Sequence, residues 1–156
     1  MSLPITPADL DDLLVLNNAH AVETSLLDRA KFERMVNMAF FARTIAGRRA
    51  LLTTFDQSAA YDSINFRWFC RRYPRFVYID RIIVSAEARG GGVARALYTE
   101  LFAAARAAGH DAITAEVNRV PPNPGSDAFH AALGFAEVGR GTPMAGKDVS
   151  YLLKRL

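Results

Sequence analysis

The sequence predicts one mixed α/β domain built around a central sheet. Strand-like and helix-like segments alternate through its 156 residues, and no repeat, low-complexity tract or linker interrupts them. The most strand-prone run, residues 76–84, leads into a glycine cluster and then into a segment with apolar residues at helical spacing. Segments that alternate in this way pack as layers around one core. With 51% hydrophobic and 22% charged residues, the chain suits a single soluble domain over residues 1–156.

Two helices are expected at the N-terminal end. Thr6 followed by Pro7 is typical of a helix N-cap with proline at the first helical position. Leucines then recur at roughly helical spacing, which predicts a helix over residues 7–18. A second pattern of the same kind predicts a helix over residues 28–39.

The next segments predict the first part of the sheet. Residues 40–45 and 49–55 are strand-like and flank Gly47, which favours a β-hairpin. Residues 56–75 form a polar and aromatic connection whose pattern assigns no element. Residues 76–84 then predict a strand that runs directly into the glycine cluster.

The remaining segments predict a helix, a strand, a short helix and two last strands. Val93, Leu97 and Leu101 repeat every four residues, and Gly109 stands where the helix would end. The further elements are expected at residues 112–117, 123–133, 135–138 and 150–153.

The glycine cluster is the most informative feature of the chain. Residues 89–94 read Arg-Gly-Gly-Gly-Val-Ala at the junction of the expected strand and helix. Glycines allow close approach of the backbone, and a helix N-terminus offers free N–H groups and a positive dipole end, so the junction suits a phosphate group. A simple tight turn is the alternative. The dinucleotide fingerprint is absent because Arg95 stands where its third glycine belongs, and the Walker loop is absent as well.

The loop resembles the central motif of the GNAT superfamily of acetyl-CoA-dependent N-acetyltransferases. That motif is Arg or Gln, two residues, Gly, one residue, then Gly or Ala, and Arg89, Gly92 and Ala94 match it. The preceding strand residues Ile82, Ile83 and Val84 also match, with Val84 five residues before Arg89.

A second GNAT motif lies downstream. Asn123, Gly134 and Phe135 are in register with it, while Ser126 takes the place of its alanine and His130 the place of its tyrosine. By element order the resemblance covers about residues 40–156. It implies the GNAT fold, a central mixed β-sheet flanked by helices.

The resemblance also implies a binding mode for acetyl-CoA, the expected co-substrate. The molecule would lie in a notch between two splayed central strands, with its pyrophosphate on backbone N–H groups and its pantetheine arm paired with the main chain of Ile82 and Val84. One of those N–H groups would polarise the thioester carbonyl. The residues assigned to the cofactor are Ile82, Ile83, Val84, Arg89, Gly90, Gly91, Gly92, Val93, Ala94, Arg95, Asn123, Ser126, Phe129 and His130. For Arg89 and Arg95, solvated surface positions are the alternative.

The expected reaction is direct attack of an amine on the thioester, which requires a base and benefits from an acid. Glu116 is the first candidate base because related enzymes often place a glutamate near the end of this strand. Asp80, a carboxylate inside an apolar strand, is the second. His130 is the candidate acid, although the family usually has tyrosine there. The alternatives are structural or solvated carboxylates and a packed histidine.

Residues 66–76 combine aromatic side chains with four arginines and contain Trp68, the only tryptophan. The segment would line an acceptor pocket, form a dimer surface, bind nucleic acid, or simply pack. We favour packing together with an acceptor or dimer role. Tyr61, Asp62, Ser63 and Asn65 are plausible acceptor-side groups. Cys70, the only cysteine, has no partnered motif and is interpreted as a buried or incidental thiol.

The sequence therefore predicts an N-acetyltransferase that moves an acetyl group to a small-molecule or peptide amine. A GNAT-fold acetyl-CoA sensor without useful catalysis is the alternative, and a nucleic-acid-binding module built on residues 66–76 is a further one. A net charge of +3 alone does not indicate nucleic acid. We expect no bound metal, no membrane span and a cytoplasmic protein. Dimers are common among relatives, so a homodimer stays open.

Overall fold

The computed structural model describes residues 1–156, with Val22 and Glu23 described by their backbone alone. A seven-stranded mixed sheet has the order β1-β2-β3-β4-β5-β7-β6. Its strands are β1 Leu3–Pro4, β2 Phe41–Thr44, β3 Ala50–Asp56, β4 Val77–Val84, β5 Ala112–Val120, β6 Ala136–Met144 and β7 Lys147–Arg155. The helices are α1 Leu10–Ala19, α2 Ala21–Thr24, α3 Arg29–Met38, α4 Ile64–Cys70, α5 Val93–Ala107 and α6 Pro124–Ala132. The predicted mixed α/β fold is confirmed.

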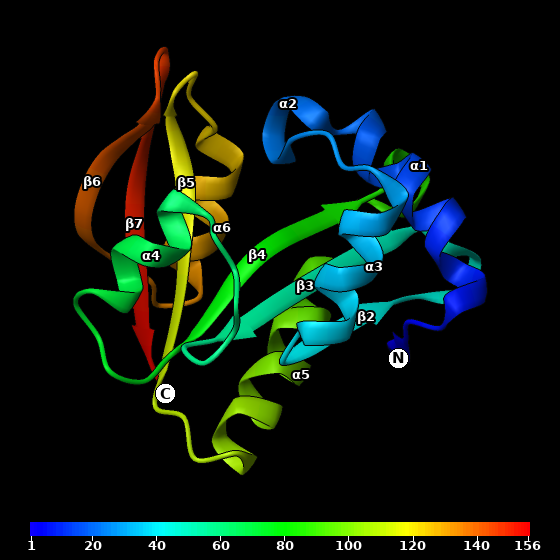
Figure 1. Cartoon of the computed structure of the whole chain (residues 1–156), viewed down its shortest axis with the longest axis horizontal. Helices are drawn as coiled ribbons and strands as arrows, with labels where there is room; N and C mark the ends of the chain where they lie inside the picture. The colour runs from blue at the N-terminus through cyan, green and yellow to red at the C-terminus, as the bar shows by residue number, and fades with distance from the viewer.

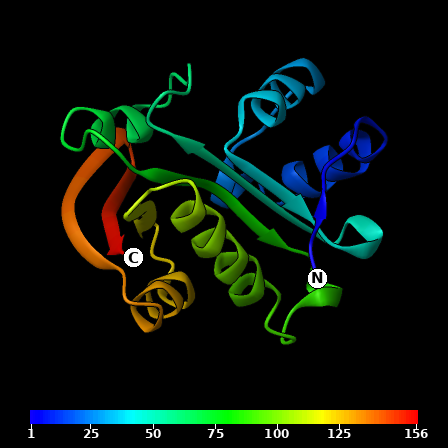
Figure 2. The ribbon, with the colours of Figure 1, turned by 90° about the horizontal axis from the view of Figure 1, so that it is seen from below.

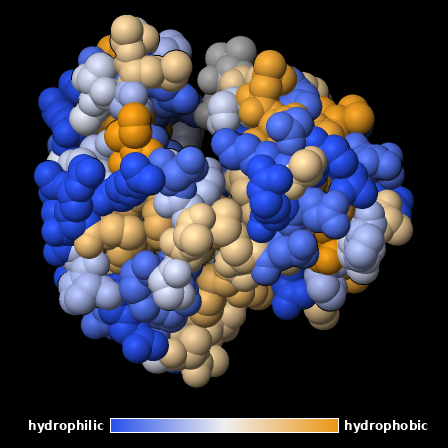
Figure 3. All heavy atoms as spheres, in the orientation of Figure 1, coloured by the Kyte–Doolittle hydropathy of each residue, from blue (hydrophilic) through white to orange (hydrophobic). Residues whose placement is uncertain are grey.

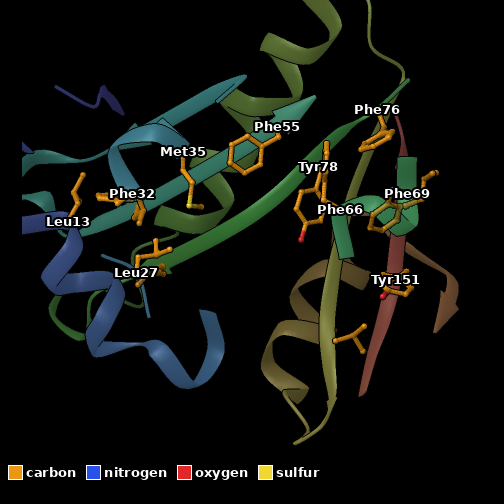
Figure 4. Packing of buried hydrophobic residues seen from close by; sticks show 14 of the residues in the cluster. Leu13, Leu27, Phe32, Met35, Phe55, Phe66, Phe69, Phe76, Tyr78 and Tyr151 are labelled. Atoms are coloured by element: carbon orange, nitrogen blue, oxygen red, sulfur yellow. The ribbon is translucent and has the colours of Figure 1, made fainter. Parts of the chain in front are cut away.

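Helices cover both faces of the sheet, so the molecule has three layers (Figures 1 and 2). Residues of α1, α3 and α4 pack on one face in a single cluster that includes Leu13, Phe32 and Phe66 (Figure 4). Residues of α5 pack on the other face, where Leu97 and Leu101 contact the opposite side of the same strands. Adjacent residues of a strand point to opposite faces, which gives the sheet these two cores.

Most predicted elements are found within a few residues of their expected bounds. The hairpin around Gly47 is antiparallel, and Gly109 and Gly134 follow their helices with positive φ angles of 83° and 89°. Helix α4 lies inside the segment 56–75 that the pattern left unassigned, and the short β1 was not predicted. The last two strands are longer than expected and form an antiparallel pair.

The sheet opens between its two central strands. Strands β4 and β5 run parallel, and their pairing is limited to Val77 with Ile113 and Tyr78 with Thr114. Beyond this point the strands diverge, as the green and yellow arrows of Figure 1 show. Strand β4 stays paired with β3 and β5 with β7 along their outer edges. The inner edges beyond Tyr78 are therefore free to pair with another extended molecule.

The glycine loop lies at the open end of this cleft and begins α5. Gly92 is the N-cap residue of the helix and adopts the left-handed conformation, with φ 75°. A residue with a side chain would be strained in this conformation. The loop and the diverging strands place free backbone N–H groups beside the cleft.

Candidate active site

Two neighbouring cavities occupy the cleft between β4 and β5. The first has a volume of about 500 Å³ and is lined by Ile82, Val84 and Phe129, close to the start of α5. The second has a volume of about 300 Å³ and includes Asp80 and Glu116 in its wall. Both are lined by Thr24, Ile82, Asn123, Ser126 and His130, so they meet at these residues. Figure 3 shows the surface hollowed between the half built on β5 to β7 and the half built on β2 to β4.

Nine of the fourteen sequence-predicted cofactor residues line the first cavity, and Gly90, Gly91, Gly92, Val93 and Arg95 do not. Arg89 donates from Nε to the carbonyl oxygen of Val84 at 3.1 Å, and its Nη2 lies 3.2 Å from Nε2 of His20. The side chain of Ile83 packs in the core against α1 and α3, so its contribution to the cavity is its backbone. The side chains that line this cavity from the predicted set are Ile82, Val84, Arg89, Ala94, Asn123, Ser126, Phe129 and His130.

The glycine loop leaves open space where a phosphate group would lie. A Cβ atom added at Gly90 or Gly92 would meet no atom within 4 Å, and both residues have positive φ angles. The backbone at these two glycines therefore faces open space rather than packed protein. Gly91, Val93 and Arg95 belong to the same short segment and are exposed or half-buried.

Glu116 lies on β5 and has one carboxylate oxygen held and the other free. Its Oε1 accepts hydrogen bonds from the hydroxyl of Tyr78 at 2.9 Å and from Nδ2 of Asn65 at 3.1 Å. Its Oε2 is inaccessible to solvent and has no hydrogen-bond partner among the described residues. Burial raises the pKa of Glu116 to about 7, although the bond from Tyr78 opposes the rise. A carboxylate with this pKa can accept a proton near neutral pH.

Asp80 lies on β4 in the wall of the same cavity, but both of its oxygens are paired. Tyr61 donates its hydroxyl to Oδ1 at 2.8 Å, and Arg81 donates from Nε to Oδ2 at 3.1 Å. The side chains of Asp80 and Arg81 are only 6% and 4% exposed. Burial raises the pKa of Asp80, while the charge of Arg81 opposes this rise. Asp80 is therefore engaged in a buried ion pair, and Glu116 has the freer oxygen.

Arg81 connects this ion pair to the segment that covers the cavity. Its guanidinium also donates to Oδ1 of Asn17 and to the carbonyl oxygens of Thr24 and Ser25, at 2.9, 3.1 and 3.2 Å. These acceptors belong to α1 and to the residues that end α2. One buried cation thus fixes the edge of the cleft formed by this segment.

His130 lies on α6 where the two cavities meet, and its side chain is buried. Its Nδ1 lies 2.8 Å from the carbonyl oxygen of Ser126, which can only accept, so Nδ1 carries the proton. Its Nε2 therefore accepts from the hydroxyl of Tyr98, which lies 2.9 Å away. Burial lowers the pKa of His130, which favours this neutral form. Donation from neutral His130 toward the cavity requires the Nδ1–H bond to Ser126 to open, because Nε2 carries no proton.

The aromatic segment packs into the protein, as the favoured interpretation predicted. Phe66, Phe69 and Phe76 are buried, and Trp68 stacks on Tyr151 with ring centroids 4.2 Å apart. The guanidinium carbon of Arg72 lies over the ring of Trp68, 3.8 Å from its centroid. Ser63 and Asn65, at the start of α4, line the second cavity together with Tyr61. Of the two interpretations of Cys70, a buried or an incidental thiol, the structure contradicts burial, because Cys70 is exposed and lies outside both cavity walls.

Sequence reasoning missed three tyrosines of the site. Tyr78 contacts Glu116, Tyr98 contacts His130, and Tyr151 contacts Asn65, each through its hydroxyl. All three are buried, and in the sequence they look like ordinary core aromatics of a strand or helix. The available signal was that a buried tyrosine hydroxyl needs a partner, which the sequence alone does not name.

The sequence profile of the GNAT acetyltransferase family matches residues 37–135, which include both motifs and the cleft. The chain belongs to the GNAT acetyltransferase family. Its matched region runs from the end of α3 to the start of β6, so it contains β4, β5 and the glycine loop. Among curated proteins, none matches this sequence.

Solved structures of similar fold cover the whole chain. The ribosomal-protein-alanine N-acetyltransferase from Brucella melitensis is 24% identical, with all of this chain and 99% of its own covered and a TM-score of 0.71. Naa20 of Chaetomium thermophilum, in complex with a bisubstrate analogue, is 18% identical, with coverage of 100% and 86% and a TM-score of 0.77. NAA60 of Arabidopsis thaliana, in complex with acetyl-CoA, is 17% identical, with coverage of 100% and 99% and a TM-score of 0.71. At these identities the likeness establishes the GNAT fold.

The described residues contain neither a metal-binding cluster nor a helix suited to cross a membrane. Within the described residues, no group of three or more histidine, cysteine, aspartate or glutamate side chains is arranged to hold a metal ion. In the same part of the chain, no helix has the length and apolar character that crossing a bilayer requires.

Proposed function

We propose that this GNAT protein is an acetyl-CoA-dependent enzyme that transfers the acetyl group to a primary amine by direct attack in a ternary complex. The observation that carries the proposal is Oε2 of Glu116, a buried carboxylate oxygen without a partner in the wall of the second cavity. Burying a carboxylate oxygen without a partner costs free energy, and groups of this kind are concentrated at functional sites. The second cavity meets the first at Thr24, Ile82, Asn123, Ser126 and His130, where the thioester would arrive.

The first cavity suits acetyl-CoA. Its pyrophosphate would lie on the N–H groups of Gly90 to Arg95, where Gly90 and Gly92 face open space. Its pantetheine arm would pair with the free edge of β4 at Ile82 and Val84, because β5 has left that edge. Arg89 lies beside this path and supplies a positive charge for the phosphates. When bound, acetyl-CoA supplies an activated acyl carbon.

The second cavity suits the amine. The amine would enter as an ammonium group and lose a proton to Oε2 of Glu116. Its nitrogen then forms a bond to the acetyl carbon, and the bond from that carbon to sulfur breaks. A backbone N–H of the free β4 edge would polarise the thioester oxygen during attack. His130 remains the proposed acid for the leaving thiolate, by turning its Nδ1–H away from the carbonyl oxygen of Ser126. The nitrogen loses its second proton as the amide forms, and that proton replaces the one given to the thiolate.

Calorimetric titration with acetyl-CoA, with CoA for comparison, tests the cofactor. We expect one-site binding at micromolar concentration. Gly92→Val should abolish it, since a side chain there fills the phosphate position and strains a φ of 75°. Gly109→Val is the matched control, because Gly109 has a φ of 83° at the other end of α5 and lies outside both cavities. Equal binding by wild type and Gly92→Val would contradict this placement.

Thiol release from acetyl-CoA in the presence of amines tests the reaction. The structural relatives include enzymes named for protein acceptors, such as the ribosomal-protein-alanine N-acetyltransferase, so short peptides with a free N-terminal amine come first. Small-molecule amines follow. Amine-dependent thiol release supports the enzyme. Binding of acetyl-CoA without release for any amine would instead support a sensor.

A further inference from the structure

We infer that Asn65 is a positioning residue that orients Glu116 toward the amine, with the hydroxyl of Tyr151 fixing the direction of its amide. This inference rests on the proposed function, because it assigns a role relative to the proposed base. Asn65 belongs to α4, in the segment for which the sequence pattern predicted no element.

The hydrogen bonds determine which way the amide of Asn65 faces. An ionised carboxylate only accepts, so Nδ2 of Asn65 must face Oε1 of Glu116, 3.1 Å away. The amide oxygen Oδ1 then faces Tyr151, whose hydroxyl donates to it at 2.8 Å. Tyr151 on β7, Asn65 on α4 and Glu116 on β5 thus form a continuous chain of hydrogen bonds.

Helix α4 is held firmly enough to define this geometry. Ser63 caps its N-terminus by accepting from the backbone N–H of Phe66 at 3.3 Å. The rings of Phe66 and Phe69 are buried, and Trp68 stacks on the ring of Tyr151. Gly139 on β6 leaves the space that Trp68 occupies, since a Cβ there would overlap its ring. The same tyrosine therefore anchors the helix by stacking and the amide by hydrogen bonding.

Asn65 decides which oxygen of Glu116 is free. With Tyr78 it supplies the two donors on Oε1, which leaves Oε2 as the oxygen without a partner. Without Asn65 the carboxylate keeps one donor and gains freedom to turn. A lost donor also destabilises the ionised form, so the pKa of Glu116 should rise. The other ionisable groups around Glu116 are Tyr78 and Asp80 from β4, Tyr61 before α4, Tyr98 from α5, and Lys147 and Tyr151 from β7.

Titration of the Glu116 carboxyl carbon by NMR tests the inference. The chain has six glutamates, so glutamate-selective ¹³C labelling gives few signals, and Glu116→Gln identifies the one of interest. The wild-type midpoint should lie at about 7. Asn65→Ala should raise it by about 0.5 to 1 pH unit, as expected for one lost hydrogen bond. Tyr151→Phe should raise it less, because Asn65 remains while its orientation is loosened.

Arg67→Ala is the matched control, since Arg67 is exposed on the same helix and lines neither cavity. The titration midpoint of Glu116 in Arg67→Ala should equal that in wild type. An unmoved midpoint in Asn65→Ala would overturn the role of Asn65. If Asn65→Ala fails to fold, the midpoint of Tyr151→Phe decides in the same way.

The titration needs neither acetyl-CoA nor an amine. A failure of the inference about Asn65 can therefore be distinguished from a failure of the proposed function. A wild-type protein that transfers no acetyl group to any amine would overturn the proposed function whatever the midpoint does. An unmoved midpoint would overturn the role of Asn65 even in an active enzyme. In an active enzyme, Asn65→Ala should lose activity at about pH 7 and regain most of it about one pH unit higher.

Discussion

The two walls of the cleft each present a carboxylate to the same cavity, but in different states. On β4, Asp80 is paired with Arg81 and accepts from Tyr61, so both oxygens are engaged. On β5, Glu116 has two donors on one oxygen and none on the other. Burial raises the pKa of both, and the guanidinium beside Asp80 opposes that rise.

The difference shows that burial by itself does not make a base. Asp80 is buried as part of an ion pair that holds the α1–α2 segment through Arg81. Glu116 is held by neutral donors, which orient it without neutralising a charge. Of the two carboxylates, we therefore propose a structural role for Asp80 on the β4 wall and a chemical role for Glu116 on the β5 wall. Four predictions test this division.

Glu116→Gln should have the largest effect. It removes the base but keeps the shape of the side chain, so turnover should fall by about 10²- to 10⁴-fold. The affinity for acetyl-CoA should change little, because Glu116 lies outside the first cavity. Steady-state rates and calorimetry on the same preparation measure both. A wild-type rate would move the base to Asp80 or to water.

Asp80→Asn should act mainly on stability. It leaves the buried guanidinium of Arg81 without its carboxylate, which should lower the free energy of unfolding by about 3 kcal/mol, the low end for a broken buried pair. Arg81 keeps its acceptors on Asn17, Thr24 and Ser25, which limits the loss. Urea unfolding measures the change. Full stability together with a large loss of turnover would reverse the assignment of the two walls.

Glu116→Gln should also stabilise the protein above neutral pH. The pKa of Glu116 is raised from 4.5 to about 7 on folding, so the folded state binds more protons between these values. Stability attributable to this group then falls as pH rises through that window. The variant should exceed wild type by about 1 to 3 kcal/mol at about pH 8 and differ little at about pH 5. Equal unfolding curves at both pH values would mean that Glu116 is not buried as described.

Tyr61→Phe should have the smallest effect. It removes one donor from Asp80, which should cost about 1 to 2 kcal/mol of stability. Tyr73→Phe is the matched control, since the hydroxyl of Tyr73 makes no hydrogen bond within the described residues. Thermal unfolding compares the two. If Tyr61→Phe loses no more stability than Tyr73→Phe, the hydrogen bond from Tyr61 does not stabilise the ion pair of Asp80 with Arg81.

Local patterns were sufficient to predict most of this fold. The helical spacing of Val93, Leu97 and Leu101 and the β-prone run 76–84 gave α5 and β4 nearly at their bounds. The same patterns missed α4, because it has only seven residues, and these include three aromatics and one arginine without a clear apolar stripe. Tertiary contacts stabilise α4, because Trp68 stacks on Tyr151 and Phe66 packs in the core.

Sequence motifs and patterns named several residues of the candidate site. Glu116 and Asp80 were named from the sequence and line one cavity, while Arg89 and Ala94, which flank the glycines, line the neighbouring one. The partners that distinguish the two carboxylates were not predictable, because they come from distant parts of the chain. Tyr78 lies 38 residues from Glu116, and Tyr151 lies 86 residues from Asn65. Only folding shows that Asp80 is paired and that Glu116 has a free oxygen.

The pH dependence of kcat/KM for acetyl transfer, compared between wild type and Glu116→Gln, tests the central claim most directly. The base works as a carboxylate, and its pKa is raised to about 7. The wild-type rate should therefore rise about tenfold per pH unit below neutrality and level off above about pH 7. Glu116→Gln should lose this limb and stay slow throughout. A wild-type profile that is flat below neutrality, or a limb that persists in Glu116→Gln, would contradict the assignment of Glu116 as the base.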